Sequence, residues 1–374
     1  MTLALASAPD EAPPRGDAPR KSLFTVQILR GFAAIAVAIY HTHLILAKPQ
    51  YGAIDVFGAV TSRGWVGVNF FFVLSGFIIL FAHTRDIGQP AAAGRYIWRR
   101  FSRVYPIYWI FTALYVIAAL LNLGSPEFRW TAENLISSAT LIRFDPRPLA
   151  PLAVAWTLFY EVGFYAIFLT LILNRRFGVA VIAAWAVGIF VSSLVFGRTS
   201  PGILHMWNVY FLLGMGVYAL FRRLQARWAL PILIGGFVML AAMLAAGMVH
   251  PRIGPAGRDT VELLLLALCF AAILLGAILY ERDRVFTPPA LLLLLGDASF
   301  SIYLVHSPVL SVAAAVNHKL FPGLLPPELV FIVTAIVAVA AGVLAYLLIE
   351  RPLLAVLNRF GPRRRVAVQP AMAQ

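Results

Sequence analysis

Charged residues are scarce in this chain of 374 residues: they make up 12% of it, whereas soluble proteins average about 25%. Hydrophobic residues make up 61%, and the mean hydropathy is +0.84. So few polar side chains cannot cover the surface of so many apolar ones, so lipid is the expected solvent. This excludes a soluble single-core domain, and the composition also excludes disordered, collagen-like and nucleic-acid-binding proteins.

Cysteine is nearly absent, because Cys269 is the only one in the sequence. A single cysteine forms no intrachain disulfide and cannot build a cysteine-based metal cage. Cys269 also lies within an apolar run, where a thiol is usually inert. We therefore expect no metal site and no redox chemistry.

Long apolar segments, in contrast, are abundant. Ten of them are long enough to cross the roughly 30 Å hydrocarbon core of a bilayer. They are continuous runs of about 18 or more residues, which predicts helices rather than the alternating strands of a barrel. The expected fold is an all-α integral membrane bundle of about ten transmembrane helices. The ten segments are 24–47, 65–82, 104–123, 152–173, 177–196, 203–221, 229–249, 261–280, 291–316 and 329–349.

Basic residues are distributed unevenly between the connections that join these segments. With the N-terminus in the cytoplasm, 21 Lys and Arg fall on the cytoplasmic side and nine on the outer side, as the positive-inside rule requires. We therefore expect both termini in the cytoplasm, with a tail at 1–21, a ten-span domain at 22–354 and a basic tail at 355–374. The same bias explains much of the net charge of +14 without a nucleic-acid partner.

Arg30 and His41 lie within or at the edge of the first span, where an ionisable group is a candidate functional residue. Their separation of eleven residues brings them within about 20° of the same helix face, about 16 Å apart along the axis. His41 is either a packed histidine bonded to a neighbouring helix or a general base for a hydroxyl group. The aligned guanidinium favours the second interpretation, since imidazole exchanges a proton near neutral pH.

Glu161 lies in the fourth span at a depth comparable to that of His41. A carboxylate facing His41 would orient the imidazole and raise its basicity. The alternative is a structural hydrogen bond between helices. Trp156 nearby is either a residue of the interfacial aromatic belt or a support for the site.

Four arginines precede the third span on its cytoplasmic side: Arg95, Arg99, Arg100 and Arg103. Positive-inside bias alone predicts some arginines here. Arg99 and Arg103 are one helical turn apart, and Arg100 and Arg103 are also neighbours across a turn. Such a cluster is suited to clamp a polyphosphate by bidentate hydrogen bonds, either that of coenzyme A or an anionic lipid headgroup.

The last two spans carry three further ionisable residues. We expect Asp297 to cap the start of the ninth span. His306, about nine residues deeper, precedes Pro308 and indicates a kink at which freed carbonyls line a cavity. Glu350, at the inner end of the last span, is expected to pair with nearby arginines.

Taken together, these strings resemble the membrane-bound acyltransferase family 3, especially its exopolysaccharide O-acetyltransferase branch. The resemblance covers nearly the whole chain, and it depends on the order of six motifs rather than on any one of them. The motifs are Arg30 with His41, GVNFFFVLSGFII at 67–79, RRFSRVYPIYW at 99–109, WTLFYE at 156–161, GDASFSIYLVH at 296–306 and ERP at 350–352.

The resemblance implies a ten-span enzyme that takes an acyl group, usually acetyl from cytoplasmic acetyl-CoA, and delivers it to a sugar hydroxyl of a surface or exported polysaccharide. It implies a catalytic role for His41 and a requirement for Arg30, Arg100 and Arg103 in activity. Together with the residue arguments above, we expect His41 and Glu161 to be catalytic and Arg30, Arg99, Arg100 and Arg103 to bind the acyl donor. Asn69 stands where many relatives have Asp. Ser75 is a conceivable nucleophile, although its Ser-Gly pair is also typical of close helix packing. The residues expected to support the acceptor or the site are Asn69, Ser75, Trp156, Asp297, Tyr303, His306 and Glu350.

The expected function is therefore that of a membrane O-acyltransferase in the cytoplasmic (inner) membrane. Its expected partners are acyl-CoA as the donor, a saccharide acceptor, the lipid bilayer and polysaccharide-export machinery, with no bound cofactor and no nucleic acid. The alternative is a transporter or flippase for a lipid-linked saccharide, which broken helices and inverted repeats would favour, and no internal repeat is visible. A membrane scaffold or sensor explains the buried charges poorly.

Overall fold

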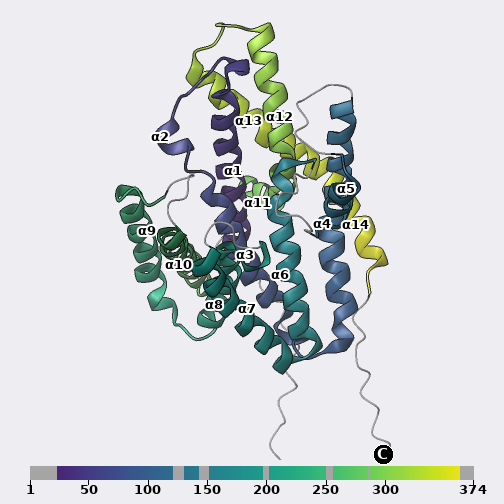
Figure 1. Cartoon of the computed structure of the whole chain (residues 1–374). Helices are drawn as coiled ribbons and strands as arrows, with labels where there is room; N and C mark the ends of the chain where they lie inside the picture. Colours follow the sequence, from purple (N-terminus) through teal and green to yellow (C-terminus); the bar gives the residue numbers. More distant parts are fainter. Residues whose placement is uncertain are drawn as a thin grey trace, which may run out of the picture.

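The computed structural model describes residues 23–120, 130–142, 151–196, 202–249, 256–284 and 287–362. Within these ranges the chain is helical and contains no strand, which confirms the predicted fold class (Figure 1). The predicted tail at 1–21 and the residues after 362 lie outside the described part. The helices are α1 (Phe24–Leu46), α2 (Gly58–Thr61), α3 (Val66–His83), α4 (Ala93–Leu120), α5 (Ala132–Thr140), α6 (Trp156–Leu173), α7 (Arg175–Phe196), α8 (Val209–Phe221), α9 (Ala229–Ala245), α10 (Ala256–Arg282), α11 (Ala290–Asp297), α12 (Ser299–Leu320), α13 (Pro327–Ala345) and α14 (Arg351–Phe360).

In the described ranges, nine helical segments are long and apolar enough to cross a membrane. Their outward surface is apolar as well: Leu194 on α7 and Phe237 and Val238 on α9 are more than half exposed. Apolar surface of this extent is stable against lipid rather than water. The chain is therefore a multi-pass membrane protein, whereas the side on which its termini lie stays a prediction.

The sixth predicted span, 203–221, is not one continuous helix. Its helical part, α8, has 13 residues, about 20 Å of helix and too short to cross the hydrocarbon core alone. Before it the chain forms short 3₁₀ turns, and the buried Asn208 side chain donates hydrogen bonds to the carbonyls of Gly202, Ile203 and His205. Trp185, midway along α7, donates a further bond to Ile203 (2.6 Å). Non-helical backbone is tolerated at this depth because these side chains satisfy its carbonyls.

The ninth predicted span, 291–316, is divided between two helices. α11 ends at Asp297 and α12 begins at Ser299. The junction lies against α1, since a Cβ atom on Gly296 would stand 2.2 Å from the carbonyl oxygen of Gln27. Only glycine permits backbones to approach this closely. The junction therefore fixes α12 beside α1.

α1 packs against α3, α11, α12 and α13 (Figure 1). At its start, the backbone N–H groups of Phe24 and Thr25 donate to the carboxylate of Glu281 at the end of α10. At its other end, Ile45 and Leu46 pack with Leu310 of α12 and residues of α13. α1 and α12 therefore run in the same direction, so polar residues along one can meet those along the other at successive depths.

Candidate functional site

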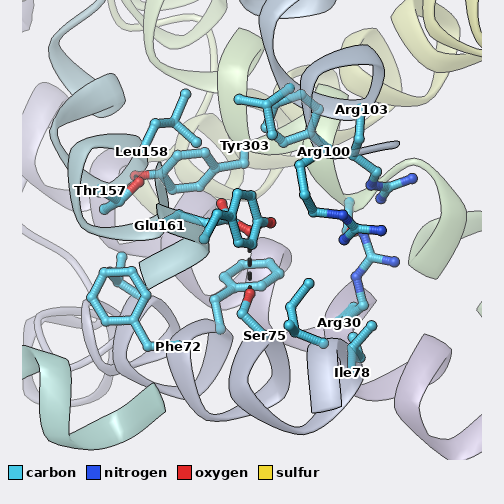
Figure 2. Close-up of a pocket in the computed structure, with 17 residues that line it drawn as sticks. Arg30, Phe72, Ser75, Ile78, Arg100, Arg103, Thr157, Leu158, Glu161 and Tyr303 are labelled. Atoms are coloured by element: carbon cyan, nitrogen blue, oxygen red, sulfur yellow. Dashed lines mark hydrogen bonds between the residues drawn. The ribbon is translucent and has the colours of Figure 1, made fainter. Parts of the chain in front are cut away.

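A cavity opens between α1, α3, α4, α6 and α12, with about 790 Å³ of space free of protein atoms including its mouth. Its walls combine apolar side chains with a concentrated polar set (Figure 2). The polar lining residues are Arg30, Ser75, Arg100, Arg103, Thr157, Glu161, Tyr165, Ser299 and Tyr303.

One side of the cavity is strongly positive. Figure 2 shows the guanidinium groups of Arg30, Arg100 and Arg103 close together, on the side away from Thr157 and Tyr303. Arg30 donates to the hydroxyl of Ser299 on α12 (2.9 Å), and its guanidinium interacts electrostatically with Arg103. The structure thus gathers three of the four predicted donor-binding arginines. Arg99 is exposed and does not line the cavity.

Arg100 is held over an aromatic ring rather than by a carboxylate. Its guanidinium carbon lies 5.6 Å from the ring centroid of Tyr165, a distance typical of cation–π contacts. Its Nε is buried and has no hydrogen-bond partner among the described residues. Like-charged guanidinium groups with unused donors are suited to bind an anionic ligand with several oxygens.

Glu161 faces the same cavity but not His41. Ser75 donates to its Oε1 (3.3 Å), and the hydroxyl of Tyr165, one turn further along α6, donates to the same oxygen. Matching depth in the sequence led us to expect Glu161 beside the imidazole of His41, but the structure does not bring the two together. The reason is that Glu161 lies at the level of Arg30, with which it lines the cavity and interacts electrostatically, and not at the level of His41.

His41 meets a second histidine instead. Nε2 of His306 on α12 lies 3.2 Å from Nδ1 of His41, and the ring centroids are 4.8 Å apart. His306 is fully buried. The predicted common face of Arg30 and His41 is confirmed, because both contact α12. His43 turns away toward Asp55 (3.5 Å), as its angle on the helix predicts.

Tyr303 connects the histidine pair with the cavity. It lines the cavity, and its ring centroid is 5.8 Å from that of His306. Its hydroxyl donates to the carbonyl of Val154 (2.7 Å) and lies 2.9 Å from the hydroxyl of Thr157. A fixed tyrosine thus lies between the arginine-lined space and the two imidazoles.

Asp297 and Glu350 have hydrogen-bond donors that the sequence did not predict. Asp297 does not cap α12, because it is the last residue of α11 and accepts a hydrogen bond from the side chain of Gln27 (2.6 Å). Glu350 is fully buried in a π-helical turn, Tyr346–Glu350, and its Oε2 accepts a hydrogen bond from Ser301 (2.6 Å). The expected attraction to an arginine is present with Arg30, but without a direct hydrogen bond among the described residues. In both cases a neighbouring helix supplies a neutral donor that the local sequence does not reveal.

The remaining predicted residues lie outside the cavity, except for Ser75. Asn69 is buried on α3 near Tyr210. Trp156 contacts Trp207, with ring centroids 4.7 Å apart and the rings tilted by 41°. The Ser-Gly pair does allow close packing, since a Cβ atom on Gly76 would lie 2.1 Å from the carbonyl oxygen of Phe211 on α8.

Sequence reasoning missed Tyr165 and Ser299, which line the cavity and hold Glu161 and Arg30. A signal for Tyr165 was present, because residues four apart on a helix share a face and Glu161 precedes it by four. Ser299 lies within the string 296–306, but nothing in the local sequence indicates that it meets the first span.

Comparison with known proteins agrees with this architecture. Residues 24–348 match the family model described as an acyltransferase domain, the acyltransferase-3 family. The chain is 30% identical over 320 residues to the exopolysaccharide production protein ExoZ of Rhizobium meliloti (strain 1021), covering 81% of this chain and 92% of that protein. It is 28% identical over 386 residues to the acyltransferase MdmB of Streptomyces mycarofaciens, covering 91% of this chain and 93% of that protein. No solved structure matches it significantly.

Proposed function

The chain belongs to the acyltransferase-3 family, and on that premise we propose that this membrane acyltransferase moves an acetyl group from cytoplasmic acetyl-CoA to a hydroxyl of a surface or exported polysaccharide, or of its lipid-linked precursor. The relative named for exopolysaccharide production supports a saccharide acceptor. We place the enzyme in the inner membrane, where a cytoplasmic donor and an exported acceptor meet, with export machinery supplying the acceptor. The observation that carries the proposal is that α1 and α12 join an arginine-lined cavity to a histidine pair.

In this proposal the cavity binds the acyl donor. Coenzyme A carries several phosphate groups, and guanidinium groups bind phosphate oxygens through paired N–H donors. Arg30, Arg100 and Arg103 would hold these phosphates, while the apolar walls accept the thioester arm. The arm would then direct the acyl group toward Tyr303 and the histidine pair.

His41 would act as the general base. Its free ring nitrogen takes the proton of the acceptor hydroxyl while the hydroxyl oxygen attacks the thioester carbonyl. A carbon–oxygen bond forms, the carbon–sulfur bond breaks, and the imidazolium returns the proton to the departing thiolate. The products are the acetylated saccharide and free coenzyme A, so proton and acyl group are both accounted for without an acyl-enzyme.

The transporter alternative is supported by two interrupted helices, at 202–208 and between α11 and α12. Discontinuous helices form substrate sites in many transporters. At 202–208, however, the carbonyls are bonded by Asn208 and Trp185, and none of these residues lines the cavity. The junction of α11 and α12 does adjoin the cavity through Ser299, but there Ser299 bonds to Arg30 and Gly296 packs against α1. Both interruptions therefore have a structural explanation, and the polar cavity favours acyl transfer.

The proposal is tested by following labelled acetyl from acetyl-CoA into saccharide from the native host. Membranes would contain wild-type protein, His41→Ala or, as a matched control, His43→Ala at equal protein levels. Loss of a general base lowers the rate by about 10²–10⁴-fold, so we expect transfer by wild type and His43→Ala and almost none by His41→Ala. Equal transfer by all three would remove His41 from the chemistry. No transfer by any of them, with varied acyl donors and folded protein, would favour transport.

A further inference from the structure

The hydrogen positions on the two imidazoles follow from the carbonyl oxygens beside them. Nδ1 of His41 lies 2.9 Å from the carbonyl oxygen of Val37, and Nδ1 of His306 lies 3.1 Å from that of Ile302. A carbonyl oxygen only accepts hydrogen bonds, and a neutral imidazole has one N–H group. Both neutral rings therefore carry their hydrogen on Nδ1 and their lone pair on Nε2, an assignment made from the network.

This assignment gives the contact between the rings a direction. Nε2 of His306, which has a lone pair, lies 3.2 Å from Nδ1 of His41, which has a hydrogen. His41 therefore donates one N–H group to two acceptors, the carbonyl of Val37 and the ring of His306. The reverse direction would turn a lone pair of each ring toward a carbonyl oxygen. The remaining nitrogen, Nε2 of His41, has no hydrogen-bond partner among the described residues.

We propose that His306 is a positioning residue for acyl transfer, which accepts the Nδ1 hydrogen of His41 and so holds the Nε2 lone pair of His41 ready for the acceptor hydroxyl. This inference rests on the proposed function. The position that His306 occupies relative to the base is the one that a carboxylate holds in many hydrolases. We expected Glu161 in that position, but Glu161 is bonded to Ser75 and Tyr165.

A neutral partner suits this environment. When His41 takes up a proton on Nε2, its Nδ1–H becomes a stronger donor, and the ring of His306 stabilises the positive charge without itself carrying a charge in the buried interior. The polar rings around the pair are Tyr40, 5.2 Å from His41 between centroids, and Tyr303, 5.8 Å from His306. Neither imidazole is hydrogen-bonded to a carboxylate in the described part of the chain.

The test compares three variants in proteoliposomes with the full chain. His306→Leu removes the acceptor, whereas His306→Gln keeps an amide oxygen near the position of Nε2. Thr42→Val is the matched control, since Thr42 is buried next to His41 and its hydroxyl bonds only to the carbonyl of Ala38 among the described residues. Removing a residue that supports a reacting imidazole is expected to lower kcat about 10- to 100-fold.

We expect His306→Leu to show this loss in kcat while its KM for acetyl-CoA stays within about twofold of wild type, because the pair lies outside the donor cavity. His306→Gln should recover most of the loss, and Thr42→Val should match wild type. An unchanged kcat in His306→Leu would overturn the proposal. Equal losses in His306→Leu, His306→Gln and Thr42→Val would also overturn it, since they would indicate a packing role.

A spectroscopic measurement separates this inference from the proposed function. In protein with ¹⁵N-labelled histidine, the resonances absent from His41→Ala identify His41. We expect a protonated Nδ1 and an unprotonated Nε2 in the wild type, with an altered Nδ1 resonance in folded His306→Leu. The opposite tautomer, or an Nδ1 resonance indifferent to His306, would overturn the pairing even if wild-type protein transfers acetyl. The expected resonances in protein without transfer activity would support the pairing and reject the proposed function.

Discussion

Two helix pairs in this bundle are packed in different ways. α9 and α10 meet through small and apolar residues: a Cβ atom on Gly276 would lie 2.5 Å from the backbone nitrogen of Leu233, and Cys269 packs on Met243. α1 and α12 also share apolar contacts, such as Leu46 with Leu310, but add polar ones, at Arg30 with Ser299 and at His41 with His306. In lipid, small residues suffice for close helix packing, so the polar contacts of α1 and α12 are not needed for packing alone and agree with the catalytic role proposed for this pair.

The comparison predicts its largest effect on donor binding at Arg30. Arg30→Gln removes a charge from the cavity, and hydrogen bonds to charged groups contribute about 1.5–3 kcal/mol. We therefore expect the KM for acetyl-CoA to rise about 10- to 150-fold, measured by steady-state transfer. Arg351→Gln, at an exposed position on α14, is the control and should leave KM unchanged. A normal KM in Arg30→Gln would remove Arg30 from donor binding.

In the α9–α10 pair, we expect a substitution to lower stability without lowering kcat. Gly276→Ala forces its new methyl group against the backbone of Leu233, and overpacking of this kind destabilises proteins by about 1–3 kcal/mol. Thermal unfolding in detergent should show the loss of stability, while kcat per folded protein stays at the wild-type value. If kcat falls in protein that remains folded, the two helix pairs are not functionally distinct and the comparison fails.

The smallest effect is expected at Tyr303. Tyr303→Phe keeps the ring but removes the hydroxyl that bonds to Val154 and contacts Thr157. One hydrogen bond contributes about 0.5–1.5 kcal/mol, so kcat should fall about 2- to 12-fold. Tyr108→Phe, which loses a similar bond to the carbonyl of Ser138 (2.8 Å), is the matched control for stability alone. Equal kcat values in the two variants would show that the hydroxyl of Tyr303 makes no specific contribution to catalysis.

The sequence was sufficient for features that depend on length, composition and local angle. Apolar runs predicted the helical bundle, and the spacing of Arg30 and His41 predicted their common face. Contacts between distant segments were not predictable in this way. The sequence predicts a similar depth for Glu161 and His41, but in the folded bundle Glu161 lies with Arg30 in the cavity, and His306 of α12 meets His41 instead.

The predictions that were wrong also failed because they concern contacts between distant segments. The segment 203–221 is apolar enough to be a span, but the bonds from Asn208 and Trp185 to its carbonyls depend on the folded bundle. Likewise, Asp297 has the residue type of a helix cap, yet Gln27 on α1 is its partner. Residue type and spacing identify which groups need a partner, whereas packing decides which partner they obtain.

The central claim is that donor binding and proton removal are separate tasks performed along the same helix pair. Equilibrium binding of coenzyme A to purified wild-type, Arg30→Gln and His41→Ala protein tests it most directly. The account predicts wild-type affinity in His41→Ala, although that variant transfers no acetyl, and an affinity about 10- to 150-fold weaker in Arg30→Gln. Weak binding by His41→Ala together with normal binding by Arg30→Gln would contradict it.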